Sequence, residues 1–373
     1  MRSVAVDATA LLGPRTGVGV AVAGLLGSLA GGPQRIVGYG LTATGWRRLP
    51  ALLPEGVVAA PRPLPAGLLM RAWEHLDLPA VESLVGRVDV VHGTNFVVPP
   101  ARRAARLVTV NDLTPVRFPE LVTATSRRYP TLVARALAGG ADVHTPSELV
   151  AAEVREHFAV ATERVHVVAY GVAASTSGMG TASGVGTAEG VGRCVPPYVL
   201  ATATAEPHKD LPGLVAAWDR VAGELPELRL RLLGPQGWGE AELVEAIGRA
   251  AHRDRIERLG WVEDPAPVVR GAALLAYPSR YEGFGFPPLE AMAEGVPVVA
   301  TAAGAVPEVV GDAAALVPVG DTDALAAAML KVLTDSAEVA RLVAAGRERV
   351  ARYSWAAAGE AFAGLYEQLS ARG

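Results

Sequence analysis

The stretch AALLAYPSRYEGFGFPPLEAMAEGVPVVAT, residues 272–301, holds the pattern that decides the fold. Short apolar runs at 272–279 and 296–301 stand at its two ends and are typical of buried β-strands. Between them, PPLEAMAEG predicts a helix, with Pro287 or Pro288 in its first positions and Gly295 just past its end. A strand, a helix and a second strand in this order predict a βαβ unit with parallel strands.

The same alternation of apolar strands and helical segments runs through the whole chain. Strands are predicted at 3–8, 88–93, 106–112 and 164–171, and again at 197–205, 228–234, 272–279, 296–301 and 314–320. Repeated strand–helix units predict doubly wound α/β architecture with parallel sheets. Between the two groups, residues 173–193 are rich in Gly, Ser, Thr and Ala, which is typical of a flexible linker.

These patterns divide the chain into two Rossmann-like α/β domains. We expect the first over 1–172, a linker over 173–195 and the second over 196–354. Segment 355–373 carries an amphipathic last helix, which could pack on either domain. A helix start is also predicted at Thr145, with Pro146 in the first helical position. The natural ligand site of such a protein is the cleft that the two domains face.

Composition excludes several classes of protein. Of the 373 residues, 50% are hydrophobic and 19% are charged, so the chain can bury large cores and is not a disordered tail. A net charge of −4 argues against nucleic acid as a partner and leaves at most peripheral contact with a membrane. One cysteine, Cys194, excludes a disulfide framework, and the apolar run 17–32 is too short to span a bilayer. We therefore expect a cytoplasmic protein.

Two glutamates, Glu282 and Glu290, flank the Gly-, Phe- and Pro-rich turn of the opening stretch. The turn lies where a strand ends and a helix begins, and α/β proteins bind ligands at that edge of the sheet. Gly283 and Gly285 allow the backbone to approach a ligand, and the helix start favours phosphate. Glu290, expected in the first helical turn, could accept two hydrogen bonds from a ribose diol. Alternatively, Glu290 only complements the helix dipole and Glu282 is solvated.

Two further segments carry groups that suit a diphosphate. His208 and Lys209 follow a predicted strand, and Lys209 is one of only two lysines in the chain. A lysine is a good point charge for phosphate, although a solvated pair at a helix start is the alternative. The sequence GPRTGVG at 13–19 could supply backbone N–H groups through Gly17 and Gly19.

Polar residues also follow two strands of the first domain: His92 and Asn95 at one, Asn111 and Asp112 at the other. They could bind sugar hydroxyls or an acceptor, or they could be satisfied structural groups. Asp321-Thr322-Asp323 resembles a metal-binding pair of aspartates, but it precedes a helix and is better explained as its N-cap region. We expect no metal and no other cofactor.

Taken together, the chain resembles the retaining GT-B glycosyltransferases of family 4, and most closely their mannosyl- and rhamnosyltransferase-like branch. The resemblance covers nearly the whole chain. It rests on TGVG (16–19), WEHLDLPAVESLVGRVDVVHGTN (73–95), TVNDLTPVRFPE (109–120), residues 141–172, TAEPHKDLPGLVAAW (204–218) and residues 259–314 with their two spaced glutamates.

The resemblance implies a role for each matching residue of the donor site. Glu290 would bind the donor ribose, Glu282 the hydroxyls of the donor sugar, and Lys209 the diphosphate. The resemblance also implies donor contacts for His208, for the backbone of Gly283, Phe284 and Gly285, for the glycine loop at Gly17 and Gly19, and for Val262 near the nucleobase. The acceptor would meet His92, Asn95, Asn111 and Asp112, and Lys209, Glu282 and Asn111 would lie at the reacting centre. The last helix of the family usually crosses back to the first domain, so the resemblance assigns 355–373 to that domain.

This chain also departs from the family pattern. Asn111 stands where a histidine is common, and an amide cannot act as an acid or a base near neutral pH. His208 stands where arginine is frequent, and VGVAV follows the glycine loop in place of the more frequent Arg-Tyr pair. The departures concern the acceptor and catalysis more than donor binding.

The function expected from the resemblance is transfer of a sugar from a GDP-, UDP- or dTDP-sugar to an acceptor hydroxyl, with retention of anomeric configuration. The acceptor would be a small molecule, a lipid-linked sugar or a glycan, in polysaccharide, cell-wall or secondary-metabolite biosynthesis. The oligomeric state is left open. Two alternatives also stay open: a sugar-nucleotide epimerase of the same fold, and a catalytically idle homologue that binds sugar nucleotides.

Overall fold

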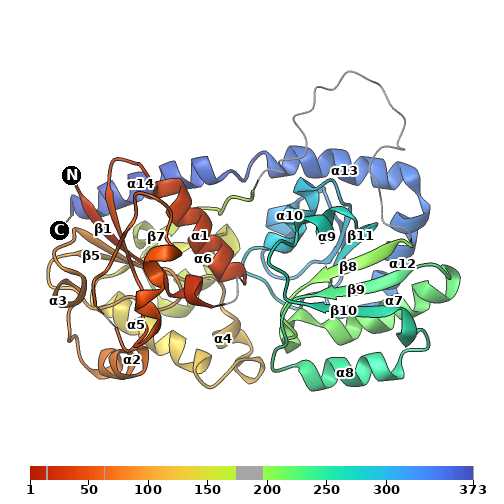
Figure 1. Ribbon diagram of the computed structural model, residues 1–373, viewed down its shortest axis with the longest axis horizontal. Coiled ribbons are helices and arrows are strands. Elements are labelled where there is room, and N and C mark those ends of the chain that lie inside the picture. The colour runs from red at the N-terminus through yellow and green to blue at the C-terminus, as the bar shows by residue number, and fades with distance from the viewer. Residues whose placement is uncertain (14–15, 63, 174–195, 373) are drawn as a thin grey trace. The chain divides into compact units, whose positions relative to one another are not determined.

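The computed structural model describes residues 1–13, 16–62, 64–173 and 196–372. The chain divides into two compact units, the first formed by Met1–Gly171 with Tyr353–Gly373 and the second by Val172–Arg352 (Figure 1). Apart from residue 173, the predicted linker lies outside the described residues, and so does Cys194. Each unit is built around its own parallel sheet.

The first unit holds a seven-stranded sheet in the order β3-β2-β1-β4-β5-β6-β7, in which every pairing is parallel. Its strands are β1 (Ser3–Asp7), β2 (Arg35–Tyr39), β3 (Val58–Ala59), β4 (Val90–Gly93), β5 (Ala105–Thr109), β6 (Asp142–Thr145) and β7 (Val165–Val167). The helices are α1 (Gly17–Leu29), α2 (Ala66–His75), α3 (Glu82–Val85), α4 (Thr114–Arg117), α5 (Tyr129–Ala138), α6 (Glu148–Phe158) and α14 (Trp355–Ser370).

The second unit holds a six-stranded parallel sheet in the order β10-β9-β8-β11-β12-β13. Its strands are β8 (Tyr198–Thr202), β9 (Arg229–Leu233), β10 (Ile256–Gly260), β11 (Leu274–Tyr277), β12 (Val298–Thr301) and β13 (Ala315–Val317). Its helices are α7 (Leu211–Glu224), α8 (Glu240–Arg249), α9 (Ala266–Arg270), α10 (Phe286–Ala293), α11 (Val306–Val310), α12 (Thr322–Thr334) and α13 (Ser336–Val350).

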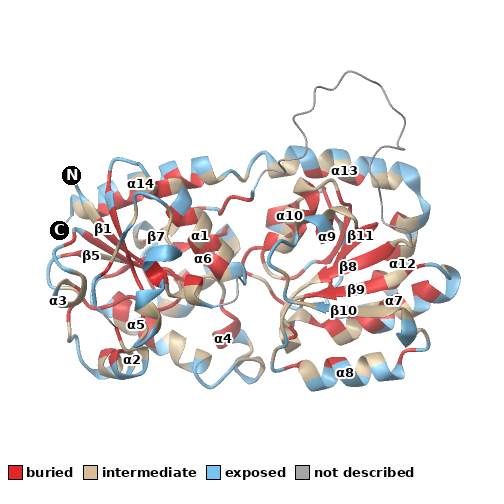
Figure 2. Cartoon of the chain, in the orientation of Figure 1, coloured by how far each residue is buried: buried red, intermediate tan, exposed pale blue. Residues whose placement is uncertain are grey.

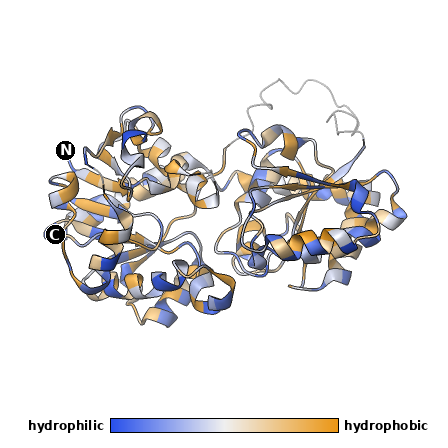
Figure 3. Ribbon diagram, turned by 60° about the horizontal axis from the view of Figure 1, so that its bottom comes forward, coloured by the Kyte–Doolittle hydropathy of each residue, from blue (hydrophilic) through white to orange (hydrophobic). Residues whose placement is uncertain are grey.

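The cores lie along the central strands, because helices cover both faces of each sheet. Residues Val4–Val6 of β1 and Leu274–Ala276 of β11 are all fully buried, as continuous apolar strands in a parallel sheet should be. The central strands of both units are therefore red in the burial view (Figure 2). In Figure 3 the helices of both units carry hydrophilic as well as hydrophobic residues, as helices with one face on a sheet should.

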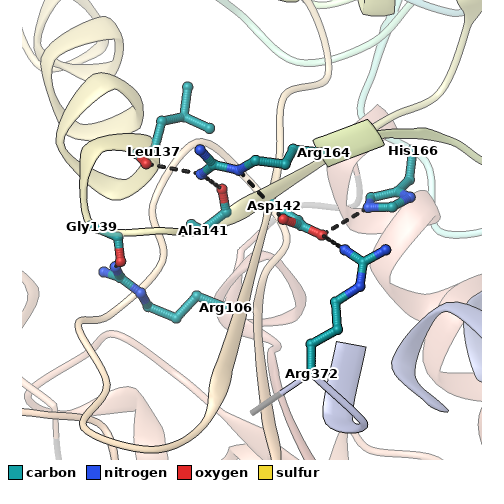
Figure 4. Close-up of polar contacts among 8 residues, drawn as sticks. All are labelled: Arg106, Leu137, Gly139, Ala141, Asp142, Arg164, His166 and Arg372. Carbon is teal, nitrogen blue, oxygen red and sulfur yellow. Dashed lines mark hydrogen bonds and ion pairs between the residues drawn. The ribbon is translucent and has the colours of Figure 1, made fainter. Parts of the chain in front are cut away.

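Helix α14 packs on the first unit through close backbone approaches. A Cβ on Gly24 of α1 would stand 2.1 Å from the Trp355 ring, and one on Gly359 would stand 2.7 Å from Cβ of Ser28. At the far end of α14, Arg372 donates to the buried carboxylate of Asp142 at 3.2 Å, and His166 contacts the same carboxylate at 2.9 Å (Figure 4). The chain thus returns from the second unit to the sheet of the first.

Every strand predicted above is present, within a few residues of its expected limits. One predicted helix start is wrong: Thr145 ends β6, and the N-cap of α6 is Ser147, whose hydroxyl accepts from the Val150 N–H at 3.3 Å. Asp321 does cap α12, accepting from the Ala324 N–H at 2.8 Å. Among the described residues, no helix combines the length and apolarity that a membrane crossing needs.

Candidate active site

The strand order of the second unit places its ligand-binding edge between β8 and β11. Strands β9 and β10 extend the sheet on one side of this pair, and β12 and β13 extend it on the other. Loops that leave the carboxyl ends of two such strands run in opposite directions and open a crevice, where doubly wound proteins bind ligands. Lys209 follows β8 and Glu282 follows β11, so the two charged residues predicted from the sequence lie at this point.

Lys209 and Glu282 form an ion pair in which Nζ donates to Oε1 at 2.7 Å. Both side chains are mostly buried, with 20% and 12% of their surface exposed. Burial by itself raises the pKa of Glu282, but the Lys209 charge and hydrogen bonds outweigh it, so the pKa lies below its ordinary value. Glu282 is therefore a carboxylate at neutral pH, and Lys209 is held against it.

The backbone fixes the loop that carries Glu282. Its carbonyl accepts from the Ala305 N–H at 2.8 Å, and the Arg280 N–H donates to the His208 carbonyl at 2.7 Å. Gly304 has a φ of 53°, and a Cβ there would stand 2.2 Å from the Glu282 carbonyl oxygen. Only glycine fits at this position, because both the left-handed backbone and the close approach exclude a side chain.

Glu290 lies in the second turn of α10, one turn later than expected, because the helix begins at Phe286 rather than at the prolines. Gly285, at φ 133°, is the N-cap. Pro287 and Pro288 carry no N–H, so the helix start offers a phosphate fewer backbone donors than the sequence suggested. The direction of the helix dipole is unaffected.

The Glu290 carboxylate makes no hydrogen bond or ion pair with any residue that the structure describes, and burial raises its pKa. The charges of both glutamates affect Tyr277, which is buried. Burial raises the pKa of the Tyr277 hydroxyl most, and the negative charges of Glu282 and Glu290 raise it further. Glu290 is thus a desolvated carboxylate with unused hydrogen-bonding capacity, close enough to the Lys209–Glu282 pair for both acids to share one neighbour.

His208 lies beside Lys209 but adds no positive charge at neutral pH. Its pKa is lowered to about 4, by burial first and then by the Lys209 charge. Its Nδ1 atom is buried and makes no hydrogen bond within the part of the chain that the structure describes. Lys209 is therefore the charge-bearing member of this pair. In the loop after β11, Phe284 is buried and packs edge-on against Phe286, with ring centroids 5.1 Å apart.

The remaining donor-site residues predicted from the sequence lie elsewhere. Val262 is half-buried in the loop after β10, next to Trp261, which is 49% exposed. Gly17 and Gly19 belong to the first turn of α1, so they are helical residues and not part of a preceding loop. Pro14 and Arg15 of the same motif lie outside the described residues. The roles of these residues in donor binding stay predictions.

In the first unit, Asn111 is the centre of a small polar network. Its amide nitrogen donates to Asn95 Oδ1 at 3.2 Å and to the Thr94 carbonyl at 3.3 Å, and its oxygen accepts from the Tyr170 hydroxyl at 2.8 Å. Asp112 accepts from the Thr114 N–H at 2.7 Å and so shapes the start of α4. Tyr170 has no motif around it and could not be found from sequence. Contact of Asn95, Asn111 and Asp112 with an acceptor stays a prediction.

His92 is a structural residue in the described fold, and its predicted contact with an acceptor finds no support there. It is fully buried, and its two ring nitrogens contact the Tyr366 hydroxyl at 2.7 Å and the Thr109 hydroxyl at 2.7 Å. Thr109 in turn contacts His144 at 2.9 Å. His144 Nε2 donates to the Val168 carbonyl at 3.0 Å. The four hydrogen bonds can therefore all run in one direction, from the Tyr366 hydroxyl through His92, Thr109 and His144 to the Val168 carbonyl. His92 therefore anchors α14 to the sheet.

Metal ligands are a separate matter. Within residues 1–13, 16–62, 64–173 and 196–372, no three His, Cys, Asp or Glu side chains converge in a way that could hold a metal ion. The expectation of a metal-independent reaction remains to be tested by experiment.

Comparisons with known proteins give the family. Residues 196–335, which hold Lys209, Glu282 and Glu290, match the model described as glycosyl transferases group 1. The O-antigen chain mannosyltransferase B of Escherichia coli is 30% identical over 274 residues, 71% of each chain. The MMP alpha-(1->4)-mannosyltransferase of Mycolicibacterium hassiacum is 32% identical over 265 residues, 68% of this chain and 58% of that protein.

Among solved structures, Anabaena HepE in complex with UDP-glucose matches over 99% of this chain and 100% of its own, with a TM-score of 0.72 and 18% identity. At that identity the match shows the fold alone. Together with the two parallel-sheet units, it establishes the GT-B fold expected from the sequence. With the level and extent of identity to the Escherichia coli enzyme, the chain belongs to the group 1 glycosyltransferases, family 4, and is a hexosyltransferase.

Proposed function

We propose that this enzyme transfers a mannosyl group from a nucleotide-diphosphate mannose to a hydroxyl of a glycan or lipid-linked acceptor, with retention of anomeric configuration. Both relatives described above are named mannosyltransferases, and one acts on an O-antigen chain. HepE, which shares the fold, binds UDP-glucose. The nucleobase of the donor is left to experiment.

One observation carries the proposal: at the switch point of the second sheet, the segment after β11 carries both the lysine-paired Glu282 and Glu290, a half-buried carboxylate without a partner among the described residues. A nucleotide sugar has a ribose diol, a diphosphate and a hydroxylated sugar in that order. Glu290 suits the diol, Lys209 the diphosphate and Glu282 the sugar hydroxyls. A ligand that carries two diol-like groups and a central dianion matches the charges of two acids and one cation.

The chemistry needs charge stabilisation more than acid–base groups. The bond between the anomeric carbon and the diphosphate oxygen breaks, and a bond to the acceptor oxygen forms on the same face of the sugar. The acceptor proton passes to the departing phosphate. Lys209 stabilises the negative charge that grows on the diphosphate, which is an effect worth several kcal/mol when the group is preorganised, about 3 kcal/mol per donor. In this scheme Asn111 does not have to transfer a proton, and no metal ion is needed to stabilise the diphosphate.

The test is a donor panel with a defined acceptor. The purified chain is incubated with GDP-mannose, UDP-glucose and dTDP-rhamnose in the presence of methyl α-D-mannopyranoside, and products are analysed by NMR. Transfer from GDP-mannose with an α-linkage supports the proposal, and a β-linked product contradicts retention.

The same panel without acceptor separates the two rivals. An epimerase would isomerise the sugar nucleotide or release nucleoside diphosphate steadily. An idle homologue would raise the melting temperature with nucleotide and give no turnover with any acceptor. A transferase, an epimerase and an idle homologue should all show this thermal shift, because each would bind the nucleotide at the candidate donor site. Absence of the shift would contradict the assignment of that site.

A further inference from the structure

The first unit has a switch point of its own, between β1 and β4. Strands β2 and β3 extend the sheet beyond β1, and β5 to β7 extend it beyond β4. By the rule that locates Lys209 and Glu282 in the second unit, a ligand of the first unit should lie outside the carboxyl ends of β1 and β4. Those ends carry Asp7, the last residue of β1, and Thr94, which follows β4.

Asp7 is a buried carboxylate with only one oxygen in use. Its Oδ1 accepts from the Thr9 N–H at 2.8 Å and from the Thr9 hydroxyl at 2.5 Å. Its Oδ2 has no hydrogen-bond partner or counterion among the residues that the structure describes. Burial raises the pKa of Asp7 to about 6, against the two hydrogen bonds from Thr9 that lower it. A carboxylate kept in this state has an unmet need for a donor.

The backbone around Asp7 is rigid. The Thr94 hydroxyl donates to the Asp7 carbonyl at 2.9 Å, so the ends of β1 and β4 are tied together. The Thr9 hydroxyl also accepts from the Leu41 N–H at 2.8 Å, which joins the turn after β1 to the loop after β2. The free oxygen is therefore presented by a fixed frame and not by a mobile loop.

Tyr129, the first residue of α5, supplies a second polar group nearby. Its ring stacks on Phe96, with centroids 4.9 Å apart and an interplanar angle of 7°. Phe96 has a φ of 60°, a strained value for a side chain of that size, and it follows β4 at the same edge of the sheet. Burial and then the Asp7 charge raise the pKa of Tyr129, so its hydroxyl feels that carboxylate. The Tyr129 hydroxyl makes no hydrogen bond with any residue that the structure describes.

The geometry points to Asp7, at the carboxyl end of β1, as the site that binds the hydroxyls of the acceptor, with the Tyr129 hydroxyl as a second polar group, and it assigns the acceptor to the neutral polyhydroxylated rings. This inference rests on the proposed function. A carboxylate accepts a hydrogen bond from one ring hydroxyl, and the phenol donates to or accepts from a second. The negative charge disfavours an acceptor that presents phosphate or carboxylate at the reacting end.

A pyranose and a cyclitol share this chemistry, so the experiment uses both. Binding of methyl α-D-mannopyranoside and of myo-inositol to the full chain is measured by saturation-transfer NMR, and transfer to each is measured with the productive donor. The test variant is Asp7→Asn, which keeps an oxygen for the Thr9 N–H but removes the carboxylate. The matched control is Asp142→Asn, which makes the same change at another buried carboxylate of the first unit, one that is paired with Arg372 and His166.

For Asp7→Asn we expect acceptor binding to weaken about 10-fold or more and the acceptor KM to rise in step, as for loss of a hydrogen bond to a charged group. Affinity for the nucleoside diphosphate should not change. For Asp142→Asn we expect a lower melting temperature, because Arg372 and His166 lose their partner, and an unchanged acceptor KM. The proposal is overturned by unchanged binding in Asp7→Asn, by an equal loss in Asp142→Asn, or by a wild-type chain that binds neither ring. A wild-type chain that binds a ring through Asp7 but transfers no sugar would instead overturn the proposed function.

Discussion

Replacing Glu290 by glutamine should weaken nucleotide binding without weakening the fold. In the free protein the Glu290 carboxylate is desolvated and has no partner among the described residues, and its pKa is raised by burial. The neutral amide removes that desolvation cost, so the free energy of unfolding should stay the same or rise. Most substitutions at a half-buried charged residue lower the free energy of unfolding, because they remove the partner of a second charged group.

The effect on binding follows from the number of acceptors. A carboxylate can accept from both hydroxyls of a ribose diol, whereas the amide offers one oxygen. The variant therefore loses about one hydrogen bond to a charged group, about 2 kcal/mol, which is about a 30-fold rise in Kd. Isothermal titration of UDP and GDP into wild type and Glu290→Gln measures the change.

A deoxyribose nucleotide turns the titration into a specific test. With 2′-deoxy-UDP or 2′-deoxy-GDP, wild type should already bind more weakly, and Glu290→Gln should add little to the loss. If Glu290→Gln weakens the binding of ribose and deoxyribose nucleotides by the same factor, the assignment of Glu290 to the ribose diol is refuted. The control is Glu294→Gln on the same segment, since Glu294 pairs with Arg270 at 2.7 Å. It should lower stability slightly and leave the Kd unchanged, the reverse of the pattern expected for Glu290→Gln.

Three further outcomes are expected. Lys209→Ala should lower kcat by about 100-fold or more, while Lys331→Ala, at the only other lysine and 63% exposed, should leave initial rates unchanged. EDTA should not abolish transfer; loss of activity that Mg²⁺ or Mn²⁺ restores would contradict the metal-independent reaction. Burial lowers the pKa of His144 from 6.5 to about 4, so the neutral form is favoured in the fold. Its contribution to stability is therefore full above pH 6.5 and lost as the pH falls toward 4, which urea unfolding at pH 7 and pH 4.5 should reveal, and a His144→Gln variant should show a weaker dependence on pH.

The positions of most candidate donor-site residues could be predicted from the sequence because they depend on local order along the chain. A strand, a glycine-rich turn and a proline-started helix place Glu282 and Glu290 at the edge of a parallel sheet wherever the rest of the chain lies. The same order places Lys209 after another strand. The exact helix start, set by Gly285 and Phe286 ahead of the two prolines, was beyond the pattern, because either start is compatible with it.

The acceptor half was harder, since polarity at a strand end does not reveal which way a side chain is used. His92 and Asn95 stand three residues apart in one motif, yet the first is sealed by Tyr366 and Thr109 and the second is half-buried beside Asn111. Asp7 lies in an apolar strand and has the sequence context of a core residue. Only its position next to β4 at the switch point gives its free oxygen a function.

The sequence by itself determined the fold class and the family and indicated the candidate donor residues, because hydrophobic period and turn chemistry depend on neighbouring residues. Tertiary structure alone decided three other matters: that Lys209 is paired with Glu282 from 73 residues away, that Glu290 is left without a partner, and that α14 closes the first unit over the histidine chain. The physical reason is that pairing, desolvation and burial depend on what lies across the sheet, and a linear pattern carries no record of those neighbours.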